Sequence, residues 1–335
     1  MTLSTKDKQK PFILIGAVIA GILLQWVIGA AVPWLAQVTQ IGVFVVILAV
    51  MLPIELVDVG AALKKFKPTA LVLVINFVFI PAFSWTLGWL FLRDHPDIWV
   101  GAILYTLTPC IGWYLIFTDI AKGNVAWGIA LLPWNITLQV ALMPAYLYLL
   151  VGKVIPVGLG SLIESVVLFL IAPFVLSFAI RRAVIGARGR DYVFGAFKGG
   201  LGEVKLWTFV AVIVSMFLSQ QALSISDVGA VGLLIAFLIG FFVVLFVLAV
   251  LAGRLFKLSY EDNATLAFTT TARNSEAVIG VALAAFPGHP LVYLAIILGP
   301  IVELPMLLLI ARIMLSLRHW IEPARLANRK IAMNV

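Results

Sequence analysis

The run from Val228 to Ala252 contains no charged or polar side chain and no alternation of apolar and polar residues. A membrane-spanning helix needs about 20 consecutive apolar residues, whereas a barrel strand alternates over about 10 residues. The run therefore predicts a transmembrane helix. Hydrophobic residues make up 63% of the 335-residue chain and charged residues only 11%. Soluble domains are about half apolar and a quarter charged, so the composition excludes a soluble enzyme and a disordered chain.

Short polar or Gly/Pro breaks separate ten such apolar segments. The predicted spans are 12–33, 40–58, 69–92, 98–119, 124–151, 160–181, 205–223, 228–252, 263–286 and 290–316. The first follows several lysines, as a signal peptide does, but no clear small-residue cleavage site comes before the next span, so we interpret it as a membrane helix. The sequence thus predicts an all-α polytopic membrane protein with ten transmembrane helices.

The distribution of Lys and Arg predicts how the spans are oriented. With the N-terminus inside the cell, nineteen of the 23 cationic residues fall in cytoplasmic segments. Arg93 and Lys153 fall outside, and Arg273 and Arg312 lie within spans. Anionic lipid and the insertion machinery retain Lys and Arg on the cytoplasmic side. We therefore expect a multi-pass cell-membrane protein with both termini cytoplasmic, and a net charge that reflects contact with lipid and not with nucleic acid.

The longest cytoplasmic segment, 182–204, divides the predicted helices into two groups of five, in residues 1–181 and 205–335. Because five is odd, the second group must be inverted relative to the first. Inverted repeats with interrupted helices are typical of alternating-access transporters. A channel or an enzyme has less reason to show this symmetry.

Each half contains a helix that its sequence interrupts. The fourth helix contains Thr108-Pro109-Cys110, and the ninth contains Thr271-Ala272-Arg273-Asn274. A helix that opens on proline follows each break, at Pro133 and at Pro300. We therefore predict broken fourth and ninth helices that cross near the middle of the membrane.

Ionisable side chains are costly inside a membrane, so those within the spans require a reason. Glu276 and Glu303 lie deepest among the acidic residues, with Arg273 beside them. Arg273 and Glu276 are three positions apart and share one face of any helix that continues between them, which suits a charge-neutralising pair. Alternatively, Glu276 or Glu303 is the proton-coupling residue, because a desolvated carboxyl group can load and release a proton.

Cys110 is the only cysteine, which excludes an internal disulfide and a multi-cysteine metal site. It follows Pro109, which frees a backbone carbonyl, and precedes Gly112. Irregular backbone at membrane depth faces protein or a cavity. Cys110 is either a packing residue or a substrate contact, and a thiol selects soft, thiophilic ligands.

Asn135 and Gln139 lie one turn apart, and these amides either hold helices together or bind substrate. Asn274 is a further predicted substrate-binding residue. The predicted pocket-shaping residues are Pro109, Gly112, Trp113, Tyr114, Trp134, Ser275 and Pro300.

At these residues the chain resembles the bile acid/sodium symporter superfamily and, within it, the arsenical-resistance family of arsenite exporters. Thr108-Pro109-Cys110, followed by Ala121-Lys122-Gly123, is similar to the cysteine-bearing helix of the exporters. Asn135 and Gln139 fall where that family has an Asn and a Gln. The stretch from Gly299 to Pro305 resembles the family's Gly-Pro-Leu-Val-Glu-Val-Pro.

The resemblance implies a secondary active transporter that exports arsenite, and sometimes antimonite, by antiport with protons. It implicates Cys110 as the contact to the metalloid and Glu276 or Glu303 in proton coupling. On this reading Asn135 and Gln139 bond the substrate hydroxyls, Arg273 stabilises an anionic form, and no cofactor is expected.

The sodium-coupled branch of the superfamily provides a contrast. Its ninth helix carries a Glu and a Gln that help to bind sodium, just before an Asn-Ser pair. Aligned on Asn274-Ser275, those positions here are Thr269 and Arg273. A fixed cation repels Na⁺ at close range, so sodium coupling is disfavoured.

Two other functions remain open. A carrier of the same fold for a small organic anion fits the bulky Trp113 and Tyr114, with Arg273 facing a carboxylate. An intramembrane enzyme or a channel is the other. His95, His289 and His319 all fall in loops or at a span end, so no histidine lies mid-span beside a nucleophile.

Overall fold

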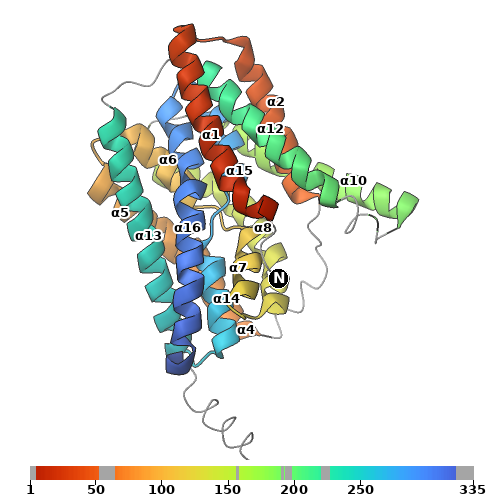
Figure 1. Cartoon of the computed structure of the whole chain (residues 1–335), viewed down its shortest axis with the longest axis vertical. Coiled ribbons are helices and arrows are strands. Elements are labelled where there is room, and N and C mark those ends of the chain that lie inside the picture. The colour runs from red at the N-terminus through yellow and green to blue at the C-terminus, as the bar shows by residue number, and fades with distance from the viewer. Residues whose placement is uncertain are drawn as a thin grey trace, which may run out of the picture.

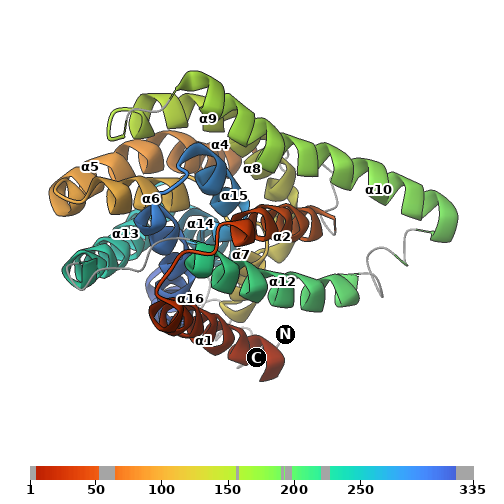
Figure 2. The same cartoon turned by 90° about the horizontal axis from the view of Figure 1, so that it is seen from above.

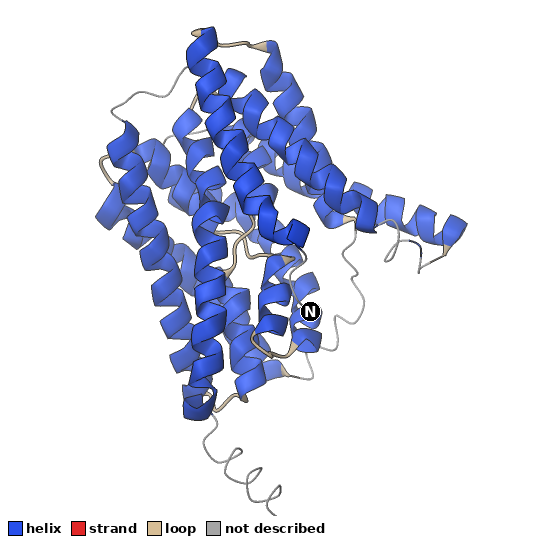
Figure 3. Cartoon of the chain, viewed as in Figure 1, coloured by secondary structure: helices blue, strands red, loops and turns tan. Residues whose placement is uncertain are grey.

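The computed structural model describes residues 5–52, 65–155, 158–189, 192, 198–219 and 227–321. Within this part of the chain the elements are helices, with no strand (Figures 1 and 3). Their bounds in chain order are α1 Thr5–Ile28, α2 Trp34–Met51, α4 Phe66–Val74, η1 Ile75–Phe79, α5 Ile80–Leu92, α6 Pro96–Thr106, α7 Trp113–Ile120, α8 Val125–Tyr146, η2 Leu147–Val151, α9 Leu159–Val166, η3 Val167–Ile171, α10 Ala172–Arg188, α12 Lys198–Ser219, α13 Asp227–Leu255, α14 Tyr260–Thr271, α15 Ser275–Ala285 and α16 Pro290–Ile321.

Seven helices among the described residues are long and apolar enough to cross a membrane. They are Trp34–Met51, Phe66–Leu92, Val125–Val151, Gly160–Arg188, Leu201–Ser219, Gly229–Leu255 and Pro290–Arg318. Three of them contain a π-helical stretch: η1 and η3 each join two α-helical parts without a break, and η2 forms the last turn of the helix that begins with α8. The protein is therefore an all-helical, multi-pass membrane protein.

The helices pack in two groups that meet at α15. In one group α12 lies along both α1 and α2, and in the other α6 lies along α16 while α13 contacts α5, α14 and α16. The helix formed by α9, η3 and α10 runs along one side of the molecule, with α1 on the opposite side (Figure 2). Because α15 contacts α2, α9, α6 and α16, it connects the two groups.

The structure breaks the chain at both positions where the sequence predicts an interruption. Helix α6 ends at Thr106 and α7 begins at Trp113, while α14 ends at Thr271 and α15 begins at Ser275 (Figure 3). Pro109 has no backbone N–H with which to continue the first helix. At the second break Ala272 takes an extended conformation with φ −71° and ψ 139°.

The prolines downstream of the breaks do not open helices, contrary to the prediction. Pro133 lies inside α8 and Pro300 inside α16, together with Pro144 and Pro305 respectively. Membrane helices tolerate interior proline because neighbouring groups satisfy the freed carbonyl. A proline in an apolar segment therefore does not locate a helix start.

Helix ends differ from the predicted spans by several residues. Helix α10 continues to Arg188 and α12 begins at Lys198, so helix extends into the predicted connector 182–204 from both sides. The end of the predicted span 40–58 lies outside the described residues. The division into two repeats stays a prediction.

Charged side chains gather near the two ends of α16. Near its C-terminal end Arg318 lies 3.3 Å from Glu261, and Lys65 lies 2.6 Å from Asp262 at the start of α14. At its N-terminal end His289 lies 3.1 Å from Asp97 in the first turn of α6. The ionic contacts thus lie at the ends of this long apolar helix, as expected if it crosses the membrane.

Candidate functional site

The two broken helices meet at their interruptions. Residues 108–110 run antiparallel to residues 272–274, with Pro109 opposite Arg273. The Cys110 N–H donates to the Ala272 carbonyl at 3.0 Å, and the Asn274 N–H donates to the Thr108 carbonyl at 2.9 Å. Each break thus satisfies backbone groups that the other break frees. This mutual pairing allows non-helical backbone at this depth.

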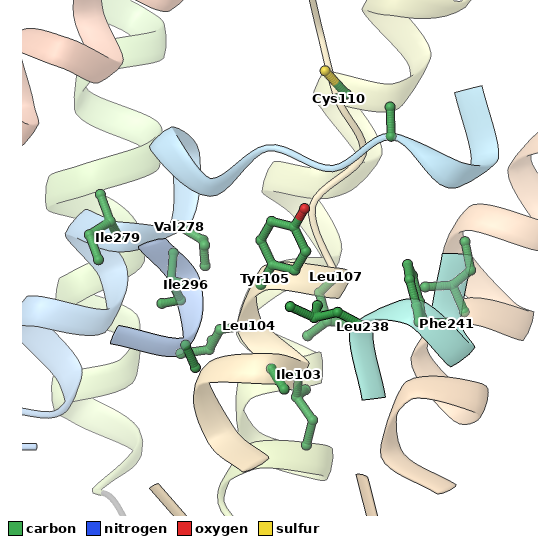
Figure 4. Packing of buried hydrophobic residues seen from close by; sticks show 14 of the residues in the cluster. Ile103, Leu104, Tyr105, Leu107, Cys110, Leu238, Phe241, Val278, Ile279 and Ile296 are labelled. Carbon is green, nitrogen blue, oxygen red and sulfur yellow. The ribbon is translucent and has the colours of Figure 1, made fainter. Parts of the chain in front are cut away.

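Cys110 lies on the crossing segment and is 3% exposed. Figure 4 shows its sulfur projecting away from the Tyr105 ring. The Gly112 N–H donates to the Cys110 sulfur at 3.5 Å. The thiol therefore lies at the N-terminal end of α7, where backbone N–H groups lack helical acceptors.

Arg273 is buried at the crossing and its guanidinium donates to protein oxygens. Nη1 donates to the Thr106 carbonyl at 3.0 Å, and Nε donates to the Thr271 carbonyl at 3.3 Å. Nη2 donates to the Asn76 side-chain oxygen at 3.1 Å and also to the Thr270 carbonyl. Four of the five guanidinium N–H donors are therefore in use.

Glu303 is the acidic residue that the structure places at the crossing, and it is 2% exposed. One carboxylate oxygen accepts the main-chain N–H of Arg273 at 3.0 Å, and the other accepts the Tyr105 hydroxyl at 2.5 Å. A Cβ atom at Gly299 would overlap the Tyr105 ring. Glycine one turn before Glu303 therefore lets the tyrosine reach the carboxylate.

Glu276 lies elsewhere. Its carboxylate is 3.0 Å from the Lys205 ammonium on α12. The predicted charge-neutralising pair with Arg273 is absent, because the helix ends at Thr271 and restarts at Ser275. Three-residue spacing places two side chains on one face only when the helix is continuous.

Asn135 takes part in a buried amide network. Its side-chain oxygen accepts from Asn76 Nδ2 at 3.3 Å, and its own Nδ2 donates to Thr269 Oγ1 at 3.3 Å. Since Asn76 also bonds Arg273, Asn135 is linked to the crossing through one residue. Gln139 is 4% exposed one turn further along α8, with no hydrogen-bonding partner for its side chain among the described residues.

The predicted pocket-shaping residues differ in their contacts and in their burial. The Tyr114 hydroxyl donates to the Gly128 carbonyl at 2.6 Å, which joins α7 to α8. Trp113 contacts Phe117 on its own helix. Of the remainder, Pro109 and Ser275 are buried, Trp134 and Pro300 are half-buried, and Gly112 is exposed.

Asn274 has a local structural role. Its side-chain oxygen accepts the Ala277 N–H at 3.2 Å and caps α15. Its backbone carbonyl also accepts the Thr108 hydroxyl at 2.9 Å. This residue therefore both ends the break and joins the two crossing segments.

Sequence reasoning missed Tyr105 and Asn76. Both are buried, and each binds a charged group that the sequence did identify, Glu303 and Arg273 respectively. Asn76 was detectable as an amide in the middle of the predicted span 69–92, where a buried polar group needs a partner. Tyr105 carries no such signal, because aromatic residues are common in membrane helices.

The chemistry gathered at the crossing comprises a thiol, a carboxylate, a guanidinium and several amides. Among the described residues no group of three or more His, Cys, Asp or Glu side chains is placed to hold a metal ion. The arrangement can bind a small polar solute by one soft ligand and several hydrogen bonds. It can also exchange a proton at a buried carboxyl group.

Residues 40–227, more than half of the chain, match the profile of the Sodium Bile acid symporter family. The chain belongs to this family. It is therefore a transporter and not an enzyme, in line with the transporter that the resemblance implies. The matched residues include Cys110 and Asn135 and end before Arg273 and Glu303.

Three relatives extend the similarity to the second half. The Arsenical-resistance protein Acr3 of Corynebacterium glutamicum is 29% identical over 269 residues, which cover 76% of this chain and 71% of that protein. The Arsenical-resistance protein Acr3 of Alkaliphilus metalliredigens is 25% identical over 289 residues, or 83% of this chain and 81% of that protein. An uncharacterized transporter of Synechocystis is 22% identical over 300 residues, or 84% of this chain and 78% of that protein.

Proposed function

We propose that this chain is a secondary active transporter that exports arsenite from the cytoplasm by antiport with protons, with antimonite as a second substrate. The observation that carries the proposal is the position of Cys110, a buried thiol on the backbone crossing of two broken helices. The arsenical-resistance names of two relatives support the substrate class. The proposal places this protein in the cell membrane, with both termini on the cytoplasmic side.

The proposed architecture has ten spans in two inverted five-helix repeats. In addition to the seven long helices, it counts α1 as one span, α6 with α7 as another, and α14 with α15 as the tenth. The antiparallel pairing of residues 108–110 with 272–274 supports it, because two inverted repeats bring their broken helices together in opposite directions.

The proposed binding step uses the thiol reversibly. Sulfur replaces one hydroxyl group of arsenous acid, the thiol proton and that hydroxyl leave together as water, and one S–As bond replaces one As–O bond. No electron is transferred, and water reverses the step at release. A single thiolate ligand suits transport, because soft ligands select the element while one bond permits dissociation.

Glu303 is the proposed proton carrier. It is buried at the crossing, whereas Glu276 is paired with Lys205 on another helix. Both partners of Glu303 donate hydrogen bonds to it, so its two oxygens are bound as an ionised carboxylate requires. A proton that enters from outside and binds Glu303 would change these two hydrogen bonds. Because one of them comes from the Arg273 N–H, protonation would act directly on the backbone of the break.

An organic anion is the second candidate substrate. The large aromatic side chains near the break favour it, but the arginine does not. Arg273 is 2% exposed and its donors are directed at protein oxygens, which leaves little of the guanidinium for a substrate carboxylate. The geometry therefore supports a small, neutral hydroxide better than an anion.

Arsenite uptake into everted vesicles, with and without an imposed pH gradient, tests the proposal. We expect uptake that saturates with arsenite, that rises when the vesicle lumen is acidified, and that Cys110→Ser abolishes at unchanged protein level. Uptake by Cys110→Ser equal to that of the parent would remove the thiol from the mechanism. Competition by organic anions, with no response to arsenite, would favour the second candidate.

A further inference from the structure

The oxygen atoms around the Arg273 guanidinium come from the ends of two helices. Thr106 is the last residue of α6, and Thr270 and Thr271 are the last two of α14. Their carbonyls accept three of the guanidinium hydrogen bonds, and the Asn76 side-chain oxygen accepts the fourth. Every one of these acceptors is a neutral oxygen in a residue with no solvent exposure.

The helix ends also supply the charge that balances the guanidinium. The free carbonyls at a helix C-terminus are equivalent to about −0.5 elementary charge, so two such ends offset about one positive charge. Among the described residues the guanidinium has no ion pair with a carboxylate, since Glu303 accepts the main-chain N–H of Arg273 instead. The Phe241 ring adds a further face that attracts cations, with its centroid 5.8 Å from the guanidinium carbon.

We propose that these oxygens form a monovalent-cation site that the chain fills permanently with the side chain of Arg273. Broken helices of transporters coordinate Na⁺ through unwound carbonyls and half-helix C-termini, which is the ligand set found here. A tethered guanidinium supplies the same charge at the same place. The crossing is then held together without any ion from solution.

The inference concerns the cation and not the substrate. It holds for any solute that the crossing carries, and thermal stability can test it without a transport assay. If arsenite transport were absent, the result on the cation site would still stand. If the cation site were absent, a positive result on arsenite transport would still stand.

Removing the guanidinium leaves a site that a free cation can enter. In Arg273→Ala the three carbonyls and the Asn76 oxygen lose their donors while remaining buried, which is unfavourable. Na⁺ or free guanidinium would restore both the charge and the oxygen contacts. Choline is too large to do so and serves as the reference cation.

The experiment measures the thermal unfolding midpoint of the purified full-length protein in detergent. The salts are choline, sodium, potassium and millimolar guanidinium chloride at constant ionic strength. Arg273→Ala and Arg273→Met are compared with the parent and with Arg273→Lys. Arg312→Ala is the matched control, because Arg312 is exposed on α16 and lies within the same kind of apolar segment.

We expect one midpoint in all four salts for the parent, for Arg273→Lys and for Arg312→Ala. For Arg273→Ala and Arg273→Met we expect a lower midpoint in choline, with an upward shift that saturates with sodium or guanidinium. If the midpoint of each of these two variants were the same in all four salts, the proposal would be overturned. Their failure to fold in all four salts would overturn it as well, because the proposal requires that a free cation can replace the side chain.

Discussion

The Lys205 ammonium on α12 lies 3.0 Å from the Glu276 carboxylate on α15. This pair joins a helix packed on α1 and α2 to one half of a broken helix. The two side chains are 30% and 20% exposed, so the contact is only partly buried. The two deepest glutamates thus differ: Glu276 has a fixed cationic partner, while Glu303 accepts hydrogen bonds from a tyrosine and a backbone N–H.

From this difference we expect Glu276→Gln to retain arsenite transport that responds to a pH gradient. Loss of a partly exposed ion pair costs about 0.2–1 kcal/mol, so the thermal midpoint should fall only slightly. Glu303→Gln should abolish the response to the pH gradient at unchanged protein level. Vesicle uptake at two lumenal pH values distinguishes the variants, and the opposite pattern would assign the proton to Glu276.

Tyr105→Phe should destabilise the crossing without changing its shape. A hydrogen bond to a charged group contributes about 1.5–3 kcal/mol, and the carboxylate left behind is buried. We expect a clear fall in the thermal midpoint of Tyr105→Phe. Tyr148→Phe, on the exposed side of the η2 stretch, is the control and should leave the midpoint unchanged. Equal midpoints for the two variants would contradict the importance of the Tyr105 hydroxyl.

Gly299→Ala should be more damaging than its size suggests. The added methyl group would overlap the Tyr105 ring, and overpacking of this kind costs about 1–3 kcal/mol. The ring must then move away from Glu303. Gly240→Ala on α13 adds the same methyl group where no atom lies within 4 Å and should be neutral or slightly stabilising. Thermal midpoints measured side by side check the contrast.

Asp262→Ala should loosen the end of the molecule where α14 begins. Its carboxylate accepts from Lys65 at 2.6 Å and from Asn124 at 2.7 Å, so the substitution leaves two donors without their acceptor. We expect a loss of about 1–3 kcal/mol, seen as a lower midpoint. Asp94→Ala is the control, since Asp94 is 83% exposed and lies 3.8 Å from Arg93. A similar fall in both variants would indicate a general effect of removing a carboxylate.

The sequence predicts the membrane class and the breaks because both depend on local composition. Apolar length alone identifies the helices, and proline at position 109 marks the first break. Arg273 and Glu303 stand out for the same reason, since charge is rare at that depth. The position of Cys110 next to Pro109 is what indicates a role for its thiol.

The partners of these residues depend on packing and could not be predicted in the same way. Nothing local to Tyr105 indicates that it reaches Glu303, which lies 198 residues further along the chain. Nor does Glu276 reveal Lys205, on a separate helix. The spacing of Arg273 and Glu276 places them on one face only in a continuous helix, and the extended backbone at Ala272, inside the predicted break, removes that condition.

The backbone pairing of residues 108–110 with 272–274 has a consequence for how the protein is made. The Thr108 carbonyl finds its donor, the Asn274 N–H, and the Cys110 N–H finds its acceptor, the Ala272 carbonyl, only in a segment synthesised much later. Until the ribosome has passed Asn274, the earlier break holds polar backbone groups that lipid cannot satisfy. The nascent first half must therefore keep this region hydrated, or sheltered by the insertion machinery, until the second half arrives to complete it.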